Sequence, residues 1–166
     1  MKKDKFIEEV KCILDASLDC IKILDLKGDI LYINRGGLLE HGFKDRLQTQ
    51  NWDYLKTIEE VYLKKIKRAM KKALDGVPST IEIKHITKGV KGASNRTWCN
   101  MTFSQVKSSK EKNAYILLVS RNITKEKKIE EKLKHKIEKL EKINKLLVRR
   151  ECKMAKMKKR LKKLEK

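Results

Sequence analysis

The 166-residue chain contains 43 Lys and Arg residues against 22 Asp and Glu residues, which gives a formal net charge of +21 at pH 7. Hydrophobic residues make up 40% of the chain and aromatic residues 5%, which is enough for one domain with its own core plus an extension, but not for two full domains. Seven Gly and one Pro exclude collagen-like chains and Pro/Gly-rich disordered chains.

The first predicted elements are a helix and a β-hairpin. Apolar residues recur at helical spacing near the start of the chain, which predicts an N-terminal amphipathic helix over residues 1–18. Two apolar-rich runs, 20–26 and 29–33, follow it on either side of Gly28. A glycine in a tight turn between two such runs is typical of a hairpin.

A short helix is expected directly after the hairpin. Asn34 suits the N-cap position, and residues 35–40 would form the helix. The adjacent Gly36 and Gly37 lower helix propensity, so we expect a brief and adaptable element. Residues 43–54 are mostly polar, which indicates irregular structure or short helical pieces.

A long helix and three strands are predicted next. Apolar residues at helical spacing predict a helix over 58–74, which Gly76 and Pro78 bring to an end. Alternation, or a nearly continuous apolar run, predicts strands over 80–87, 96–106 and 113–123. The longest uninterrupted apolar run, 114–119, is too short to cross a membrane, so we expect no membrane span and a cytoplasmic protein.

The chain changes character after Thr124, where a segment without Gly or Pro begins. From Lys125 to Lys166 there are 19 basic and 7 acidic residues, so more than half of the excess charge lies in a quarter of the chain. Leucine, isoleucine or methionine recurs every seven residues, which predicts a coiled coil, most simply a parallel dimer. A solitary charged helix is the alternative, but it would expose an apolar stripe about 60 Å long. The predicted dimer interface consists of Ile129, Leu133, Leu140, Ile143, Leu147, Met154, Met157, Leu161 and Leu164.

Together these elements predict an α+β fold. Five antiparallel strands would form a sheet with helices on one face, and a long C-terminal coiled-coil helix would follow. A helix face over a curved sheet encloses a volume that can hold side chains or a small ligand.

The order of the elements and three short motifs resemble a PAS domain. The motifs are the hairpin ending at Asn34, the helix ending Ala73-Leu74-Asp75-Gly76, and Arg121-Asn122-Ile123-Thr124 before the last helix. Asn122 stands where the family usually carries aspartate, whereas Thr124 can still cap the helix through its hydroxyl. The resemblance divides the chain into an N-terminal helix (1–18), a PAS sensory domain (19–123) and a coiled-coil helix (124–166).

The tail also resembles the linkers that follow PAS domains in bacterial and archaeal sensor kinases, most clearly over residues 144–154. The resemblance implies a sensor in a two-component or phosphorelay pathway, acting as a homodimer and partnered by a histidine kinase or a response regulator. It also implies that a signal leaves the last strand through a linker with no flexible segment. That linker consists of Arg121, Asn122, Ile123 and Thr124.

The same resemblance argues against two cofactors. Haem-binding relatives carry a ligand histidine on the long helix, and residues 58–74 contain none. Flavin photoreceptor relatives carry a reactive cysteine after the first hairpin, and residues 45–56 contain none. We therefore expect neither haem nor a flavin adduct, and the sequence identifies no other cofactor.

The cysteines and histidines give no metal-site signature. Cys12, Cys20, Cys99 and Cys152 are scattered, with no C-x-x-C pair and no histidine at ligand spacing, so we expect idle thiols and no metal site. Two of the histidines, His41 and His85, are expected to be satisfied or solvent-facing rather than ligands.

No catalytic residues are predicted. His135 on the last helix could be a phosphoacceptor, but the following Lys136 and the lack of a nearby proline favour a solvated coiled-coil surface. The sequence contains no nucleotide-binding glycine motif after it, and no paired carboxylates or Ser/His/Asp set can be argued. We therefore expect a protein that is not an enzyme.

A ligand pocket is one of two interpretations of the apolar, aromatic and sulfur-containing residues inside the predicted domain. Ordinary core packing is the other, and the sequence leaves both open. A bound molecule would be apolar or aromatic, since few charged positions point inward. The predicted pocket residues are Ile33, Leu38, Trp52, Ile66, Met70, Ile83, Trp98, Met101, Phe103 and Leu118.

The Lys-rich tail suggests a second function, which is nucleic-acid binding through phosphate. Residues 149–166 carry 10 basic and 2 acidic residues. However, these charges surround the helix, Lys outnumbers Arg by 16 to 3 from residue 125 onward, and aromatic residues for stacking are absent there. Nucleic-acid binding is therefore the secondary interpretation.

Overall fold

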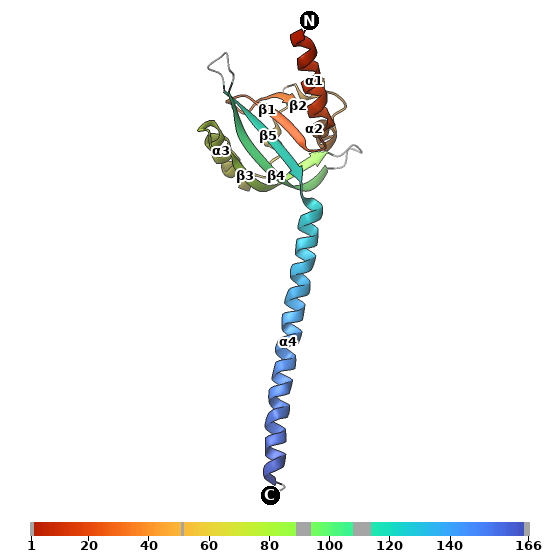
Figure 1. The fold of residues 1–166 in the computed structure, drawn as a ribbon, viewed down its shortest axis with the longest axis vertical. Helices are drawn as coiled ribbons and strands as arrows, with labels where there is room; N and C mark the ends of the chain where they lie inside the picture. The colour runs from red at the N-terminus through yellow and green to blue at the C-terminus, as the bar shows by residue number, and fades with distance from the viewer. Residues whose placement is uncertain (1, 51, 89–93, 108–113, 165–166) are drawn as a thin grey trace. The chain divides into compact units, whose positions relative to one another are not determined.

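The computed structural model describes residues 2–50, 52–88, 94–107 and 114–164 (Figure 1). It divides into two compact units, residues 1–124 and 125–166. The first unit contains, in chain order, α1 (Lys2–Ala16), β1 (Cys20–Leu24), β2 (Ile30–Ile33), α2 (Arg35–His41), the 3-10 turns η1 (Arg46–Thr49) and η2 (Tyr54–Thr57), α3 (Glu60–Leu74), β3 (Ser79–Lys88), β4 (Ser94–Lys107) and β5 (Ala114–Asn122). The second unit consists of α4 (Thr124–Leu164) from Lys125 onward.

The strands form one five-stranded sheet in the order β2-β1-β5-β4-β3. All neighbouring strands are antiparallel, so the predicted fold class is confirmed. Ser120 on β5 lies opposite Cys20 on β1 and Met101 on β4, and Met101 lies opposite Ile81 on β3. Because side chains alternate along a strand, these residues and every second neighbour share one face of the sheet.

That face is buried beneath α2 and α3. The strands contribute fully buried apolar side chains, including Leu24, Ile83, Phe103 and Leu118. Helix α3 packs against β3, β4 and β5. Its buried side chains, spaced one helical turn apart, are Ile66, Ala69, Met70 and Ala73. Removal of this apolar surface from water is what holds the helix on the sheet.

The long helix begins later than its hydrophobic pattern suggests. Helix α3 starts at Glu60, because Ile58 makes an isolated β-bridge with His85 and is buried against the sheet instead. Gly76 ends the helix in a left-handed conformation with φ of 81°, as predicted from the glycine that precedes Pro78.

Asn34 caps α2, as predicted, and also connects three elements. Its Oδ1 accepts hydrogen bonds from the backbone N–H of Gly37 at 2.9 Å and of Ile21 at 2.8 Å. Its Nδ2 donates to the carbonyl oxygens of Leu14 at 2.9 Å and of Asp19 at 3.0 Å. The fully buried amide thereby joins the end of α1, the start of β1 and the first turn of α2.

The two glycines of α2 also have a packing role that the sequence did not indicate. A Cβ added to Gly36 would lie 2.8 Å from the backbone oxygen of Asp19, and one added to Gly37 would lie 2.6 Å from Cγ1 of Ile33. The two glycines therefore allow the helix to pack tightly against the chain segments beside it.

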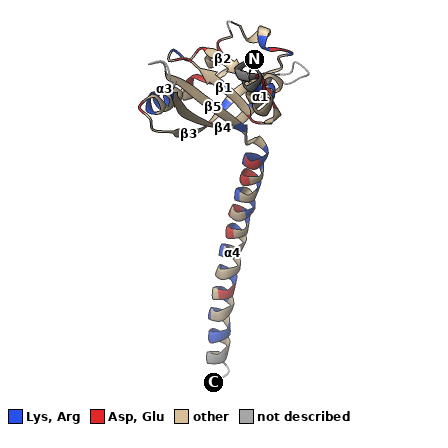
Figure 2. Cartoon of the chain, turned by 45° about the horizontal axis from the view of Figure 1, so that its top comes forward, with Lys and Arg blue, Asp and Glu red and all other residues tan. Residues whose placement is uncertain are grey.

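Helix α4 is continuous from Thr124 to Leu164, and acidic and basic residues are interspersed along it (Figure 2). The predicted seam residues are exposed in this single chain, for example Leu133 at 57% and Leu147 at 51%. In the described part of the chain, no helix is both long enough and apolar enough to cross a membrane.

Candidate functional site

A buried polar cluster lies beneath α2, at the edge of the apolar core. Lys22 comes from β1, Glu40 and His41 from the last turn of α2, His85 from β3 and Cys99 from β4. Lys22 and His85 are each 1% exposed and His41 is 4% exposed. Buried polar groups are costly unless they are paired, so their concentration at one place indicates a site rather than ordinary core.

Lys22 is the cation of the cluster. Its Nζ lies 2.9 Å from Cys20 Sγ and 3.1 Å from His41 Nε2. The same atom lies 5.9 Å from the ring centre of Trp52 and 5.7 Å from that of Tyr54, which are cation–π distances. Because an ammonium group only donates hydrogen bonds, His41 Nε2 accepts, and the ring proton is on Nδ1.

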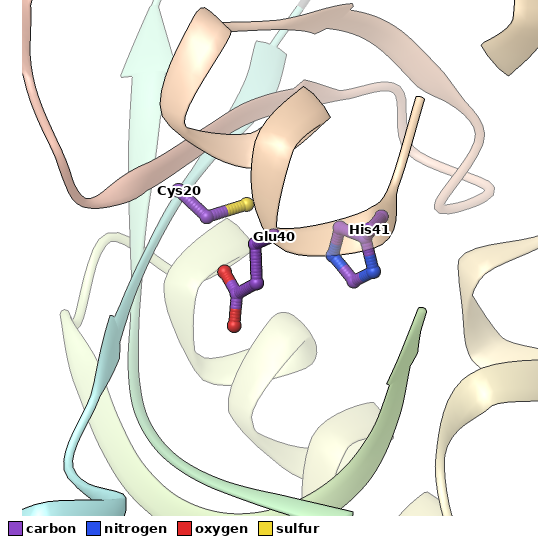
Figure 3. Close-up of side chains that lie close together, drawn as sticks. All are labelled: Cys20, Glu40 and His41. Atoms are coloured by element: carbon purple, nitrogen blue, oxygen red, sulfur yellow. The ribbon is translucent and has the colours of Figure 1, made fainter. Parts of the chain in front are cut away.

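Glu40 is the anion of the cluster and belongs to two groups of side chains. The first consists of Glu40, Cys20 and His41, whose side chains lie close together in Figure 3. One ligand-type atom from each of these three residues lies within 4.8 Å of the others. Glu40 and His41 are consecutive residues in the last turn of α2. The helix ends at His41, and Gly42 follows in a left-handed conformation with φ of 74°.

The second group joins Glu40 to His85 and Cys99. The Cys99 thiol donates to Glu40 Oε1 at 3.3 Å, and its Sγ lies 2.9 Å from His85 Nε2. The distance from His85 Nε2 to Glu40 Oε1 is 3.6 Å. Cys99 is fully buried, whereas the Glu40 side chain is 13% exposed.

The surroundings determine the charge on each group. Burial alone would raise the pKa of Glu40, but a hydrogen bond from His85 and the charge of Lys22 hold it below its ordinary value. Burial raises the pKa of Cys20, and burial together with the Glu40 carboxylate raises that of Cys99. Burial and the Lys22 charge lower the pKa of His41 far below its ordinary 6.5. The cluster thus contains an ionised carboxylate, two protonated thiols and a neutral His41.

The geometry does not support nucleophilic catalysis by Cys99. A cysteine nucleophile needs a base whose second nitrogen is oriented by another group. Here Glu40 and Cys99 both approach Nε2 of His85, while Nδ1 is buried without a hydrogen-bond partner among the described residues. A thiol with a raised pKa is also a poor nucleophile.

A pocket of about 460 Å³ opens beside the cluster. Trp52 forms part of its wall, with its ring 4.6 Å from that of His41 and 4.8 Å from that of Phe43. Asp53 and Lys56 also line it. The pocket therefore combines an aromatic wall with polar groups, and it reaches the histidine that contacts Lys22.

The predicted pocket residues are mostly core residues. Ile66, Met70, Ile83, Met101, Phe103 and Leu118 belong to the main apolar cluster, and Ile33 and Leu38 belong to a smaller one. Trp52 packs against both clusters and is the predicted residue that also lines the pocket. Trp98 lies on the opposite face of β4 from buried Thr97 and Cys99, with Lys84 Nζ 4.9 Å from its ring centre.

The polar cluster itself was not predicted. Histidines 41 and 85 were expected to be satisfied or solvent-facing. His41 is buried and bonded to Lys22, whereas His85 is buried and its Nδ1 has no hydrogen-bond partner in the described chain. Lys22 and Glu40 were not singled out at all. The alternation along each strand was the available signal, because Lys22 has the parity of buried Cys20 and Leu24.

The predicted linker residues form contacts that join the end of β5 to β1 and β4. Arg121 makes a salt bridge with Asp19 at 2.9 Å. The backbone N–H of Ile123 donates to the Trp98 carbonyl oxygen at 2.8 Å, and Thr124 Oγ1 accepts from the Trp98 N–H at 3.0 Å. Asn122 Oδ1 accepts from the Thr124 N–H at 3.0 Å. The expectation that the Thr124 hydroxyl caps α4 is therefore wrong, since this hydroxyl binds the β4 backbone.

Comparison with known proteins found matches to the fold of this chain but none to its sequence. No family model and no curated protein matches the sequence. Solved structures do match. A PAS domain from a two-component sensor histidine kinase is 11% identical with a TM-score of 0.57, and the match covers 72% of this chain and 98% of that one. This chain has a PAS-like fold.

Two further PAS structures agree. The PAS domain of a Colwellia psychrerythraea protein is 19% identical with a TM-score of 0.60, covering 72% of this chain and 98% of that one. The PAS domain of nitrogen regulation protein NR(II) from Vibrio parahaemolyticus is 16% identical with a TM-score of 0.53, covering 68% of this chain and 96% of that one. The PAS-like part is the N-terminal 70% or so of the chain, and the polar cluster lies within it.

Proposed function

We propose that this chain is a PAS-type signal-transduction module in a two-component or phosphorelay pathway. It would sense a small molecule or a partner at the pocket beside Trp52 and pass the signal to α4, which pairs with α4 of a second copy. Binding and relay, rather than catalysis, would be its activity, with a histidine kinase or a response regulator as its cytoplasmic partner. We also propose the division of the chain into a helix (1–18), a sensor (19–123) and a coiled coil (124–166).

The observation that carries this proposal is the junction between β5 and α4. Four consecutive residues, 121–124, are bonded either to Asp19, to Trp98 or to each other. A displacement of the sheet would therefore be transmitted to the first turn of α4 instead of being absorbed by a flexible linker. PAS-like neighbours from sensor kinases support the same interpretation.

The exposed stripe on α4 supports pairing. Ile129, Leu140 and Leu164 are 66%, 65% and 83% exposed in the single chain. Apolar residues at heptad spacing gain stability when a partner helix removes them from water. Two seam positions carry charge, Lys136 and Arg150, so we expect the pair to be less stable than an uninterrupted apolar seam.

Sedimentation of the full chain tests the pairing. We expect a dimer for the unaltered chain and mainly monomer for the double variant Leu140→Gln/Leu147→Gln. Glutamine keeps helix propensity close to that of leucine but removes the apolar contact at two seam positions.

The matched control is Glu138→Gln/Lys145→Gln on the outer side of the same heptads. It also introduces two glutamines without changing the net charge, and it should remain dimeric. A monomeric unaltered chain, or equal loss of dimer in both double variants, would reject pairing through this seam.

Sensing is tested by native mass spectrometry of the freshly purified full chain. We expect a co-purifying mass that is retained in the exposed-site variant Leu47→Ala and lost in Trp52→Ala, which removes one wall of the pocket. A mass retained equally in both variants would place the bound molecule elsewhere.

A further inference from the structure

We propose that Glu40, His85 and Cys99 form a binding site for a divalent transition-metal ion of the zinc type. The site lies in the sensor of the proposed function, so the role of the ion as a signal rests on that function. Binding itself does not, because the three side chains are in place in the single chain.

The spacing of the three atoms is close to what a tetrahedral ion requires. Zinc–ligand bonds of about 2.0–2.3 Å at tetrahedral angles place neighbouring ligand atoms about 3.3–3.6 Å apart. Cys99 Sγ and Glu40 Oε1 are 3.3 Å apart, and His85 Nε2 and Glu40 Oε1 are 3.6 Å apart. The pair of Cys99 Sγ and His85 Nε2, at 2.9 Å, would need to widen by a few tenths of an ångström.

The donor set selects the class of ion. A thiol, an imidazole and a carboxylate suit Zn²⁺ and neighbouring transition metals, whereas Mg²⁺ and Ca²⁺ prefer oxygen ligands alone. Three protein ligands leave a fourth position open, as in zinc sites that exchange water or a small molecule. Binding would displace the Cys99 thiol proton, which leaves to solvent as the thiolate joins the ion. The ring proton of His85 would move from Nε2, which faces Glu40, to Nδ1, so that Nε2 can bind the ion.

The other group of ligand-type side chains is already occupied by the protein's own cation. Lys22 Nζ lies within hydrogen-bond distance of Cys20 Sγ and His41 Nε2. An external ion there would have to displace this ammonium group. In the described part of the chain, Lys22 makes no hydrogen bond to His85 or to Cys99, so the group of Glu40, His85 and Cys99 is the better candidate for an ion.

His85 carries the second observation. The ring is 1% exposed, and its Nδ1 has no hydrogen-bond partner in the described part of the chain. A purely structural histidine at this depth would have both nitrogens satisfied, so its burial is unexplained by hydrogen bonding alone. Coordination through Nε2 leaves Nδ1 without a partner among the described residues, so the spacing of the three ligand atoms is what supports the site. The ring lies 5.7 Å from that of His41, which lines the pocket.

Cobalt titration tests the site, because Co²⁺ adopts zinc geometries and a bound thiolate gives a charge-transfer band in the near ultraviolet. The protein is the full chain carrying Cys12→Ser, Cys152→Ser and His135→Gln, which removes the exposed thiols and the exposed histidine of α4. We expect one equivalent of Co²⁺ to produce the band and one equivalent of Zn²⁺ to abolish it.

Variants then assign the ligands. Cys99→Ala should abolish the band, and His85→Gln and Glu40→Gln should each weaken Co²⁺ binding by about tenfold or more. The exposed variant Leu39→Ala on α2 should bind as the parent does. A parent without a band, or a band that survives in Cys99→Ala, would overturn the proposal. Far-ultraviolet circular dichroism of each variant shows whether a loss of Co²⁺ binding is due to unfolding. If one variant is unfolded, the assignment of the ligands rests on the variants that remain folded.

The variant Lys22→Met should change the affinity for Co²⁺ in the opposite direction from the ligand variants. Removal of the neighbouring positive charge should tighten Co²⁺ binding by about tenfold, because like charges repel strongly in a buried setting. Weaker binding in this variant would contradict a cation site. The result is independent of sedimentation, so a failure of metal binding and a failure of pairing can be told apart.

Discussion

His41 shows how burial of a single side chain makes stability depend on pH. It lies against the Lys22 ammonium group and inside the domain, and both features oppose its protonation. The neutral ring is therefore required by the fold. The neutral ring contributes to the free energy of unfolding. This contribution is fully present above pH 6.5, the pKa of His41 in the unfolded chain, and is lost as the pH falls toward the much lower pKa of His41 in the folded chain.

We expect the free energy of unfolding to fall by about 2 kcal/mol between neutral pH and about pH 5 through His41 alone, because the unfolded chain gains a proton that the folded chain does not. Urea unfolding at a series of pH values measures this. In His41→Gln the decrease should be correspondingly smaller.

The exposed His135 provides the control, since its side chain is 76% exposed on α4. His135→Gln should retain the pH dependence of the unaltered chain. An equal slope in the unaltered chain and in His41→Gln would contradict the assignment of this effect to His41.

At the residue scale, the sequence predicted which strand residues are buried better than it predicted which side chains contact one another. The alternation along the strands agrees with the burial of Ile83 and Met101, whereas Trp98, which was predicted as a pocket residue with them, lies on the opposite face of β4. The pairing of Glu40 with His85 and Cys99 could not be predicted, because these residues come from α2, β3 and β4 and meet only when strand order and register are known. The spacing of these three residues along the sequence does not indicate that their side chains meet.

At the element scale, α2 depends on the absence of side chains at its start. A Cβ on Gly37 would lie 2.6 Å from Cγ1 of Ile33 and 2.8 Å from Sγ of Cys20. We expect Gly37→Ala to lower the free energy of unfolding by about 1–3 kcal/mol, the usual cost of overpacking, even though alanine favours helix.

Leu39→Ala serves as the comparison on the same helix. Leu39 is 48% exposed, so its truncation should change the free energy of unfolding by about 0.5 kcal/mol or less. Thermal unfolding of both variants separates the two cases. A stabilised Gly37→Ala would mean that helix propensity outweighs packing at this position.

The type and order of the elements could be predicted because hydrophobic periodicity is a local property. The hairpin, the short helix, the long helix and the three later strands all occur in the expected order. Boundaries were less predictable where tertiary contacts compete. Ile58 has the spacing of the helix, yet it pairs with His85 on β3, and Thr124 bonds to Trp98 instead of capping α4.

At the scale of the whole molecule, the two interpretations of the positive charge differ in how they depend on salt. Residues 125–166 carry a net charge of +12, so two such helices would repel one another if they paired, and added salt would screen that repulsion. Binding to nucleic acid, in contrast, weakens steeply with salt because counterions are released.

We expect the dimer dissociation constant of the full chain to fall when NaCl is raised from low concentration to about 0.5 M, as the repulsion is screened. Sedimentation at each salt concentration measures it. Under the same conditions, binding to duplex DNA should be lost near physiological salt. DNA binding that persists there and requires residues 149–166 would favour the nucleic-acid interpretation over pairing as the role of the tail.

Two neighbouring residues of β4 contact different parts of the domain, the polar cluster and residues 123–124. Trp98 and Cys99 are consecutive, and the N–H and carbonyl of Trp98 hold Thr124 and Ile123, while the side chain of Cys99 faces Glu40 and His85. If the proposed ion binds Cys99, a displacement of its sulfur would act on β4 directly beside the hydrogen bonds that hold Ile123 and Thr124.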